Sequence, residues 1–319
     1  MRKHTLLRSS LAAVAGFALA AGVSAYVLLS PARTWDGPPD YTVDSGGLGS
    51  IADGNGGVTR TVSAITSSVA WNGAGSGTVI LAHSGSTAAI DLDDGVPMLR
   101  FSDPFSACTN PCLAATFTGY YSLRGGSSYR IYDADIVTNS TGYSWTSQGE
   151  DPGGAGCASE IYVEGVMVHE IGHALGLGHT GVGDATMASS VSFCNNDPAT
   201  TEADDESGLV ALYGSAPCTG CLVYTDYLSG TGVTQYEPLN TYYFSGAAGT
   251  HQGWLVGPGG TDFDLYLWKW DGAAWVQVAS ATSASSTESI SYSGTSGWYL
   301  WGVYSYSGAG QYHFWLKKP

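Results

Sequence analysis

Positively charged side chains are scarce in this 319-residue chain. It contains 11 lysines and arginines against 27 aspartates and glutamates, and charged residues make up only 12% of the total. A surface this acidic repels phosphate backbones and anionic lipid headgroups, which argues against nucleic acids and anionic membranes as partners. Histidine is also rare, with seven copies, whereas glycine, with 45, is about twice as common as usual. The frequent glycines indicate many turns, and hence a β-rich protein with few helices.

Long apolar runs are absent beyond the N-terminus. A basic start, MRKHTLLRSS, is followed by LAAVAGFALAAGVSA, which ends in small residues. This order is typical of a secretory signal peptide over residues 1–25, and it predicts a secreted protein without stable membrane insertion after cleavage. An uncleaved anchor is the alternative, because the apolar run continues through YVLL. Cleavage removes three basic residues and no acid, which leaves 8 basic and 27 acidic residues and a net charge of −19.

Six cysteines in an exported chain predict three disulfide bonds. Their order along the chain suggests the pairs Cys108 with Cys112, Cys157 with Cys194, and Cys218 with Cys221. The second pair would brace the segment between them from both sides. The Cys218-Thr-Gly-Cys221 spacing is also compatible with a redox-active pair, but no thioredoxin-like βαβ pattern surrounds it, so a structural clip is favoured.

The character of the chain changes at Cys218–Cys221. Before this point, helical patterns at 57–71, 160–175 and 201–213 alternate with strand-like runs at 77–83, 96–103, 114–122 and 128–139. After it come seven of the ten tryptophans, and strict alternation at 262–270 and 297–316 predicts hairpins that turn at Asp271-Gly272 and Ser307-Gly308. We therefore expect an α+β domain over 30–216 and an all-β sandwich over 222–319.

Three of the seven histidines lie within the single stretch HEIGHALGLGHT, residues 169–180. On a helix, His169 and His173 are four residues apart and face the same side, so both can bind one metal ion. Glu170 lies about 100° round the helix from His169. It is therefore badly placed as a ligand of the same ion, but it can reach a water bound to that ion, as a general base must.

The glycines of this stretch explain how a third histidine can join the first two. Gly176 tolerates the positive φ that ends a helix and turns the chain back. His179 is thereby returned to the ion that the two helical histidines hold. The pattern predicts a three-histidine zinc site with an open fourth position.

With these residues, the chain resembles the metzincin clan of zinc endopeptidases and, within it, the matrixins. Met187, eight residues after His179, has the spacing of the matrixin Met-turn, whose methionine lies under the zinc as a structural floor. The resemblance extends over residues 35–214: DADIVTN resembles the strand whose edge pairs with substrate, and DDESGLVALYG resembles the last helix, with Asp204 and Asp205 as structural acids. It implies a metzincin-type catalytic domain, a twisted mixed sheet with three helices.

Two further resemblances are less specific. DLDDG, residues 91–95, is similar to half an EF-hand loop, and matrixins usually carry calcium, so Ca²⁺ is a candidate second cofactor. DFDLYL at 262–267 and YLWGVYSYSGAGQYHFWL at 299–316 resemble the pre-peptidase C-terminal domain of secreted bacterial proteases. That resemblance supports the all-β sandwich.

Together the sequence predicts a secreted, monomeric zinc endopeptidase that acts on extracellular proteins or peptides. One Zn²⁺ is held by the three histidines, and Glu170 takes a proton from a zinc-bound water and passes it to the departing amine. We expect substrate to add a strand beside residues 128–137. The alternative is a non-catalytic, metalloprotease-like protein for binding or adhesion, which would have no need of Glu170.

Overall fold

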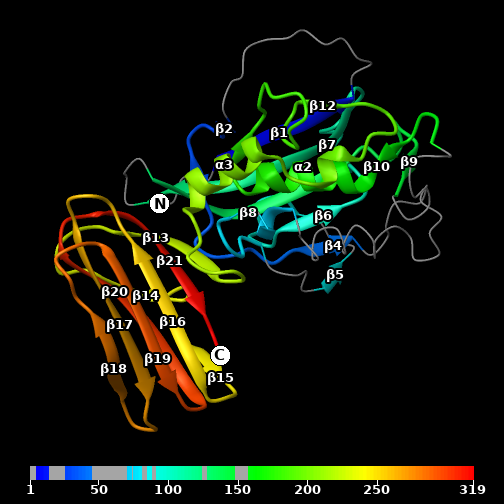
Figure 1. Ribbon diagram of the computed structural model, residues 1–319. Coiled ribbons are helices and arrows are strands. Elements are labelled where there is room, and N and C mark those ends of the chain that lie inside the picture. Colours follow the sequence, from blue (N-terminus) through cyan, green and yellow to red (C-terminus); the bar gives the residue numbers. More distant parts are fainter. Residues whose placement is uncertain are drawn as a thin grey trace.

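The structure, a computed structural model, has two regions joined near Cys218–Cys221 (Figure 1). The first carries a mixed sheet with helices, and the second is a sandwich of two antiparallel sheets. The described residues are 5–13, 26–44, 70–73, 75–80, 85–87, 91–123, 128–147 and 157–319. Among them, no helix is both long and apolar enough to span a membrane.

The sheet of the first region has eight strands in the order β12-β1-β7-β8-β6-β4-β5, and β3 also pairs with β8. The antiparallel pairs are β1 with β7 and β7 with β8, whereas the remaining pairs are parallel. The strands are β1 (Thr5–Ala13), β3 (Arg33–Thr34), β4 (Thr42–Asp44), β5 (Gly85–Thr87), β6 (Met98–Arg100), β7 (Cys112–Ser122), β8 (Tyr129–Thr138) and β12 (Ser190–Val191). Two short pairs lie outside this sheet: β2 (Val27–Leu28) with β11 (Leu177–Gly178), and β9 (Trp145–Thr146) with β10 (Ile161–Tyr162).

The strand that was expected to pair with substrate is flanked by other strands at both of its ends. β8 pairs with β7 on one side, and on the other side with β3 at residues 129–130 and with β6 at residues 135–137. A substrate strand cannot lie along the whole of residues 128–137, so that prediction is wrong. The run of buried residues in β8 is typical of a central strand, and such a pattern does not reveal which strands lie on either side. On one side, β7 is itself paired at its outer edge with β1.

Two α-helices are present among the described residues, α2 (Val163–Ala174) and α3 (Ala203–Tyr213), with 3₁₀ turns at Trp71–Gly73 and Asp197–Ala199. Helix α2 lies across the sheet (Figure 1), and all of its residues are buried. Helix α3 starts with a capping box formed by Glu202 and Asp205. The predicted helix 57–71 lies outside the described residues except at its last two positions, so two of the three expected helices are observed.

The C-terminal region is built from two sheets that bury apolar side chains between them. One sheet has the order β13-β21-β16-β19 and the other β14-β20-β17-β18, with β15 also paired to β20. The strands are β13 (Leu222–Leu228), β14 (Thr234–Glu237), β15 (Tyr243–Ser245), β16 (Gly249–Val256), β17 (Asp262–Trp270), β18 (Trp275–Ala281), β19 (Thr287–Gly294), β20 (Gly297–Ser307) and β21 (Gly310–Lys317). Phe263, Leu265 and Leu267 point inward and are fully buried, as their alternation predicts.

One of the two predicted hairpins is present, whereas the prediction of the other is wrong. β17 and β18 pair across the turn at Asp271-Gly272, where the Asp271 carboxylate accepts hydrogen bonds from the Ala273 and Ala274 amides. By contrast, β20 and β21 belong to different sheets, so the chain crosses the sandwich at residues 308–309. Buried apolar residues alternate with more exposed ones in both strands because both strands face the same core. This alternation alone does not reveal which strands are hydrogen-bonded to each other.

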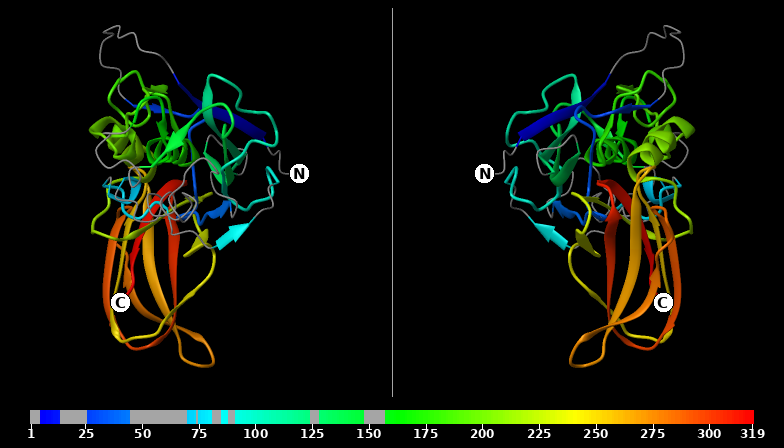
Figure 2. Two further views of the ribbon diagram at one scale, coloured as in Figure 1. Left: turned by 90° about the vertical axis from the view of Figure 1, so that its right-hand side faces the viewer. Right: turned by 90° about the vertical axis from the view of Figure 1, so that its left-hand side faces the viewer.

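The two regions lie against each other at their junction (Figure 2), and side chains of both are buried there. Trp315 of β21 is 2% exposed, packs into the core of the first region, and donates its indole N–H to the Ser76 carbonyl at 3.0 Å. Arg130 of β8 forms ion pairs with Asp36 at 2.8 Å and with Asp226 of β13 at 2.5 Å. The predicted regions 30–216 and 222–319 are therefore in close contact.

Candidate metal centre

Three imidazoles converge at the C-terminal end of α2. His169 and His173 lie one helical turn apart, and His179 follows β11. The Nε2 atoms of His169 and His173 are 3.1 Å apart, those of His169 and His179 are 3.2 Å apart, and those of His173 and His179 are 3.1 Å apart. The structure thus brings together the three histidines that the sequence pattern grouped.

The turn between the second and third histidines depends on Gly176. Helix α2 ends at Ala174, and Gly176 has a φ of +106°, a backbone conformation that L side chains rarely adopt. A Cβ atom at this position would lie 2.5 Å from the Arg33 carbonyl oxygen, so the backbones are also too close for a side chain. Leu177 and Gly178 then pair with β2 and return His179 toward the helix.

Two of the imidazoles have a fixed tautomer. His169 Nδ1 donates to the Thr186 carbonyl at 2.6 Å, and His173 Nδ1 donates to the Leu177 carbonyl at 2.8 Å. A carbonyl can only accept, so in each neutral ring the proton is on Nδ1 and the Nε2 lone pair faces the centre. Burial, together with the neighbouring imidazoles, lowers the pKa of His169 to about 3 and that of His173 well below its usual value.

This arrangement fits a zinc ion. Burial also lowers the pKa of His179, so all three rings are held in the neutral form that binds metals. In a tetrahedral site with Zn–N bonds of about 2.0–2.1 Å, the ligand nitrogens are roughly 3.3–3.4 Å apart, close to the separations observed here. A set of three imidazoles that leaves one position open is typical of catalytic zinc.

Met187 is buried against α2 at Gly172, in the helical turn between His169 and His173. A Cβ atom on Gly172 would lie 2.2 Å from Met187 Sδ and 2.7 Å from the Trp71 ring, so no larger residue fits without movement. The Asp205 carboxylate accepts hydrogen bonds from the amides of Thr186, at 2.8 Å, and of Met187, at 3.0 Å. Asp205 thereby ties this turn to α3, and the Thr186 carbonyl in turn orients His169.

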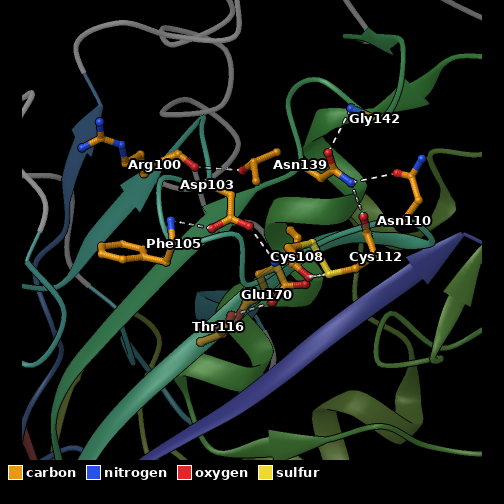
Figure 3. The surroundings of a disulfide bond; sticks show 12 residues. Arg100, Asp103, Phe105, Cys108, Asn110, Cys112, Thr116, Asn139, Gly142 and Glu170 are labelled. Carbon is orange, nitrogen blue, oxygen red and sulfur yellow. Dashed lines mark hydrogen bonds between the residues drawn. A yellow bond between two sulfur atoms is a disulfide. The ribbon is translucent and has the colours of Figure 1, made fainter.

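Glu170 is fully buried, and its carboxylate is in contact with β7. Its Oε2 accepts a hydrogen bond from the Thr116 hydroxyl at 2.6 Å (Figure 3). The sequence pattern predicted Glu170 but not Thr116, Gly172 or Trp71. No motif includes these three residues, because only the packing of α2 on the sheet and on the loops brings them to the site.

An extended segment of the chain lies next to this part of β7. β1 runs antiparallel to β7 with Ser9 opposite Thr116, and it runs parallel to β12 with Ala12 opposite Ser190. Figure 3 shows β1 as the blue strand beside β7. The space between β7 and β12 therefore accommodates one extended chain that passes Thr116, the residue in contact with Glu170.

Buried carboxylates also lie beside the 91–95 loop, where the sequence analysis raised calcium. Asp133 and Asp135 of β8 are each 1% exposed, and each has one oxygen without a hydrogen-bond partner in the part of the chain that the structure describes. Burial raises the pKa of Asp133 to about 6 and that of Asp135 to about 8. The Gly95 amide donates to Asp133 at 3.1 Å, so the predicted loop contacts this cluster.

The six cysteines form the three disulfide bonds that their order predicted: Cys108–Cys112, Cys157–Cys194 and Cys218–Cys221. The second bond links the chain just before β10 and α2 to the segment that follows Met187. It therefore closes a loop around the three histidines. No cysteine is free.

Comparison with known proteins bears out the resemblance to the matrixins. Residues 115–214 match the family model of the matrixins, and this range includes Thr116, the three histidines and Met187. Among solved structures, the pre-peptidase C-terminal domain of collagenase from Bacillus anthracis is 18% identical, covers 30% of this chain and 87% of its own, and has a TM-score of 0.25. A mitogen derived from Yersinia pseudotuberculosis is also 18% identical, with coverages of 30% and 84% and a TM-score of 0.25. A structure titled "CBM4 structure and function" is 11% identical, with coverages of 32% and 83% and a TM-score of 0.20.

Proposed function

We propose that this protein is a secreted zinc-dependent endopeptidase that hydrolyses peptide bonds of extracellular proteins. The matrixin match indicates a zinc metalloendopeptidase. The observation that carries the proposal is the convergence of three neutral imidazole nitrogens within 3.2 Å of one another, next to a buried carboxylate on the same helix. Export rests on the signal-peptide pattern of residues 1–25 and is consistent with three disulfide bonds.

In this proposal His169, His173 and His179 hold one zinc ion, and Glu170 is the general base. When bound, zinc supplies Lewis acidity, which lowers the pKa of a water and polarises the scissile carbonyl. Glu170 takes a proton from the attacking water and returns it to the departing amine. Its position beside His169 on a fully buried helix keeps the carboxylate fixed relative to the imidazoles.

We infer that substrate binds as a strand at the outer edge of β7, with its far end beside β12. The register of β1 supports this, because β1 is an extended segment held there by backbone pairing on both sides. β1 belongs to the segment expected to be removed with the signal peptide. A chain that starts at Tyr26 should therefore cleave peptides faster than a chain that retains residues 1–25, and equal rates would contradict the assignment of this edge.

Two substitutions test the roles within the HEIGHALGLGHT segment. Glu170→Ala should retain about one zinc per chain, because the imidazoles remain, but its turnover should fall by roughly 10²–10⁴-fold. His179→Ala should lose zinc affinity and activity together, since two histidines leave the ion under-coordinated. Zinc content and hydrolysis of casein, with and without a chelator, would be measured on both variants.

The outcomes separate the enzyme from its non-catalytic alternative. A wild-type protein that binds zinc but cleaves no protein or peptide would favour a binding or adhesion role. An active Glu170→Ala variant would show that Glu170 is not the general base. A His179→Ala variant that holds zinc as tightly as wild type would show that His179 is not a zinc ligand.

A further inference from the structure

Thr116 contacts the proposed base from a different element. It lies in the middle of β7 and is fully buried, 54 residues before Glu170 in sequence. Its hydroxyl oxygen is 2.6 Å from Glu170 Oε2 and 3.0 Å from the Glu170 carbonyl oxygen (Figure 3). One hydroxyl thus touches both the side chain and the backbone of the same residue.

The chemistry of a hydroxyl explains why both contacts matter. A hydroxyl has one hydrogen to donate and lone pairs to accept with. The 2.6 Å separation is in the range of a charge-assisted O–H···O⁻ bond, so the hydrogen points to Oε2 while the carboxylate is ionised. If the carboxyl carries its proton on Oε2, the hydroxyl can accept that proton's hydrogen bond and donate to the carbonyl at 3.0 Å instead. Oε2 therefore has a partner in either protonation state.

We propose that Thr116 is a positioning residue of the hydrolytic reaction: its hydroxyl holds Glu170 Oε2, so that Oε1 is the oxygen that exchanges a proton with water and with the leaving amine. This inference rests on the proposed endopeptidase function. It adds a group that acts through Glu170 and touches neither substrate nor metal. A carboxylate without this partner would sample other rotamers and present the wrong oxygen.

The location of Thr116 on β7 connects base positioning to substrate binding. The backbone of β7 pairs with an extended segment at this residue, since Ser9 lies opposite Thr116. A peptide that adds at this edge fixes the backbone of the residue whose side chain holds the base. Loss of the hydroxyl should therefore reduce turnover and leave the binding of an extended peptide nearly unchanged.

Thr118 provides a matched control on the same strand. It lies two residues further along β7, on the same face, and is also buried. Among the described residues its hydroxyl, unlike that of Thr116, has no hydrogen-bond partner. Thr118→Val removes a buried hydroxyl from the same environment without removing a contact to Glu170.

The test compares Thr116→Val, Thr116→Ser and Thr118→Val in zinc-loaded protein, with kcat, KM, zinc content and melting temperature measured for each. Thr116→Val should lower kcat by roughly 10–100-fold, the usual effect of losing a hydrogen bond to a charged group. Its KM should stay within about twofold of wild type and its zinc content near one equivalent, because neither the edge of β7 nor the imidazoles change. Thr116→Ser, which keeps the hydroxyl, should retain kcat within about threefold, and Thr118→Val should match wild type.

Several outcomes would overturn the proposal. One is a Thr116→Val kcat within twofold of the Thr118→Val value; another is a Thr116→Ser variant as slow as Thr116→Val, which would assign the effect to packing. If Thr116→Val does not fold, Thr116→Ala replaces it, and the same comparison with Thr116→Ser applies. If the wild type is active and Thr116→Val has the same kcat, this inference is wrong and the proposed function stands. If the zinc-loaded wild type is inactive, the proposed function is wrong as well.

Discussion

The two regions differ in how they treat buried polar groups. In the sandwich, Glu237 accepts a hydrogen bond from the Tyr312 hydroxyl at 2.8 Å, and His251 Nδ1 is hydrogen-bonded to Tyr243 at 2.7 Å. The buried atoms of the sandwich that have no hydrogen-bond partner among the described residues are His251 Nε2 and one oxygen of Asp262. In the described part of the first region such atoms are more numerous, and they include one oxygen each of Asp36, Asp133 and Asp135. Unpartnered buried groups are costly, and they concentrate where a protein binds ions or substrates. Such atoms are therefore concentrated in the region that also carries the three histidines.

The largest expected effect concerns the side chain that joins the two regions. Trp315→Ala should lower the free energy of unfolding by about 3–5 kcal/mol, because it empties a buried site in the core of the first region. Trp301 is equally buried but packs within the sandwich. Trp301→Ala should cost a similar amount, about 3–5 kcal/mol. Thermal unfolding followed by loss of peptidase activity and by tryptophan fluorescence measures both variants.

The pair of tryptophan variants decides whether the regions are separable. If they fold as one unit, both variants should show a single transition that lowers activity and fluorescence together. A chain that ends near Gly214 contains nearly all of the predicted α+β domain over 30–216. It should nevertheless be unstable, because it lacks Trp315 and Val223, which are part of the core of the first region. A soluble, fully active chain of this length would show that the shared core is dispensable.

The sequence predicted the sandwich strand β17 and the three histidines for the same reason: both are local patterns. Alternation orients Phe263, and spacings of four and ten residues along one helix and its turn define the three histidines. What could not be predicted depends on contacts between distant segments. The hydroxyl of Thr116 reaches Glu170 only because β7 packs against α2. β20 does not pair with β21, its predicted partner, because the connection between them crosses to the other sheet.

Gly172 tests one of these distant contacts. Gly172→Ala should destabilise the protein by about 1–3 kcal/mol and weaken zinc binding, because its Cβ would overlap Met187 Sδ and the Trp71 ring. Gly165→Ala, on the same helix, is the matched control: its nearest contact would be 3.3 Å from Asn196 Oδ1, so it should change stability by less than about 1 kcal/mol. Chemical unfolding and a competitive zinc titration measure both. Equal effects would mean that helix propensity, rather than the Met187 contact, controls this position.

The buried carboxylates make the stability of the first region depend on pH. The pKa of Asp135 is about 8 in the folded protein because of burial and the Asp133 charge, and it is about 3.9 in an unfolded chain. At a pH between these two pKa values, the folded state holds a proton that the unfolded state has released. The free energy of unfolding therefore falls as the pH rises through this range. From pH 6.5 to 8, the metal-free protein should lose about 1–2 kcal/mol, and Asp135→Asn should lose less.

Adding calcium tests whether the buried carboxylates bind this ion. If the carboxylates bind Ca²⁺, adding it at pH 8 should raise the melting temperature of the wild type, because the ion stabilises the ionised form. Asp135→Asn should not respond, whereas Asp197→Asn, an exposed acid outside the 91–95 loop, should respond like the wild type. If calcium does not change the melting temperature of the wild type, the calcium prediction is wrong for this cluster. If the free energy of unfolding does not change between pH 6.5 and 8, the burial of Asp135 does not make stability depend on pH.

The smallest effect is expected on the outer face of the sandwich, where aromatic rings are exposed. Trp298 lies three residues before Trp301 on β20, so alternation puts the two on opposite faces, and Trp298 is 43% exposed. It contacts the rings of Phe244, at 5.0 Å between centroids, and Tyr242, at 5.2 Å. Trp298→Ala should therefore cost only about 0.5–1.5 kcal/mol, the usual value of an exposed aromatic contact, and should leave hydrolysis of a soluble peptide unchanged. A loss as large as that of Trp301→Ala would mean that this face is covered in the folded protein, and that the sandwich buries aromatic side chains on both sides of β20.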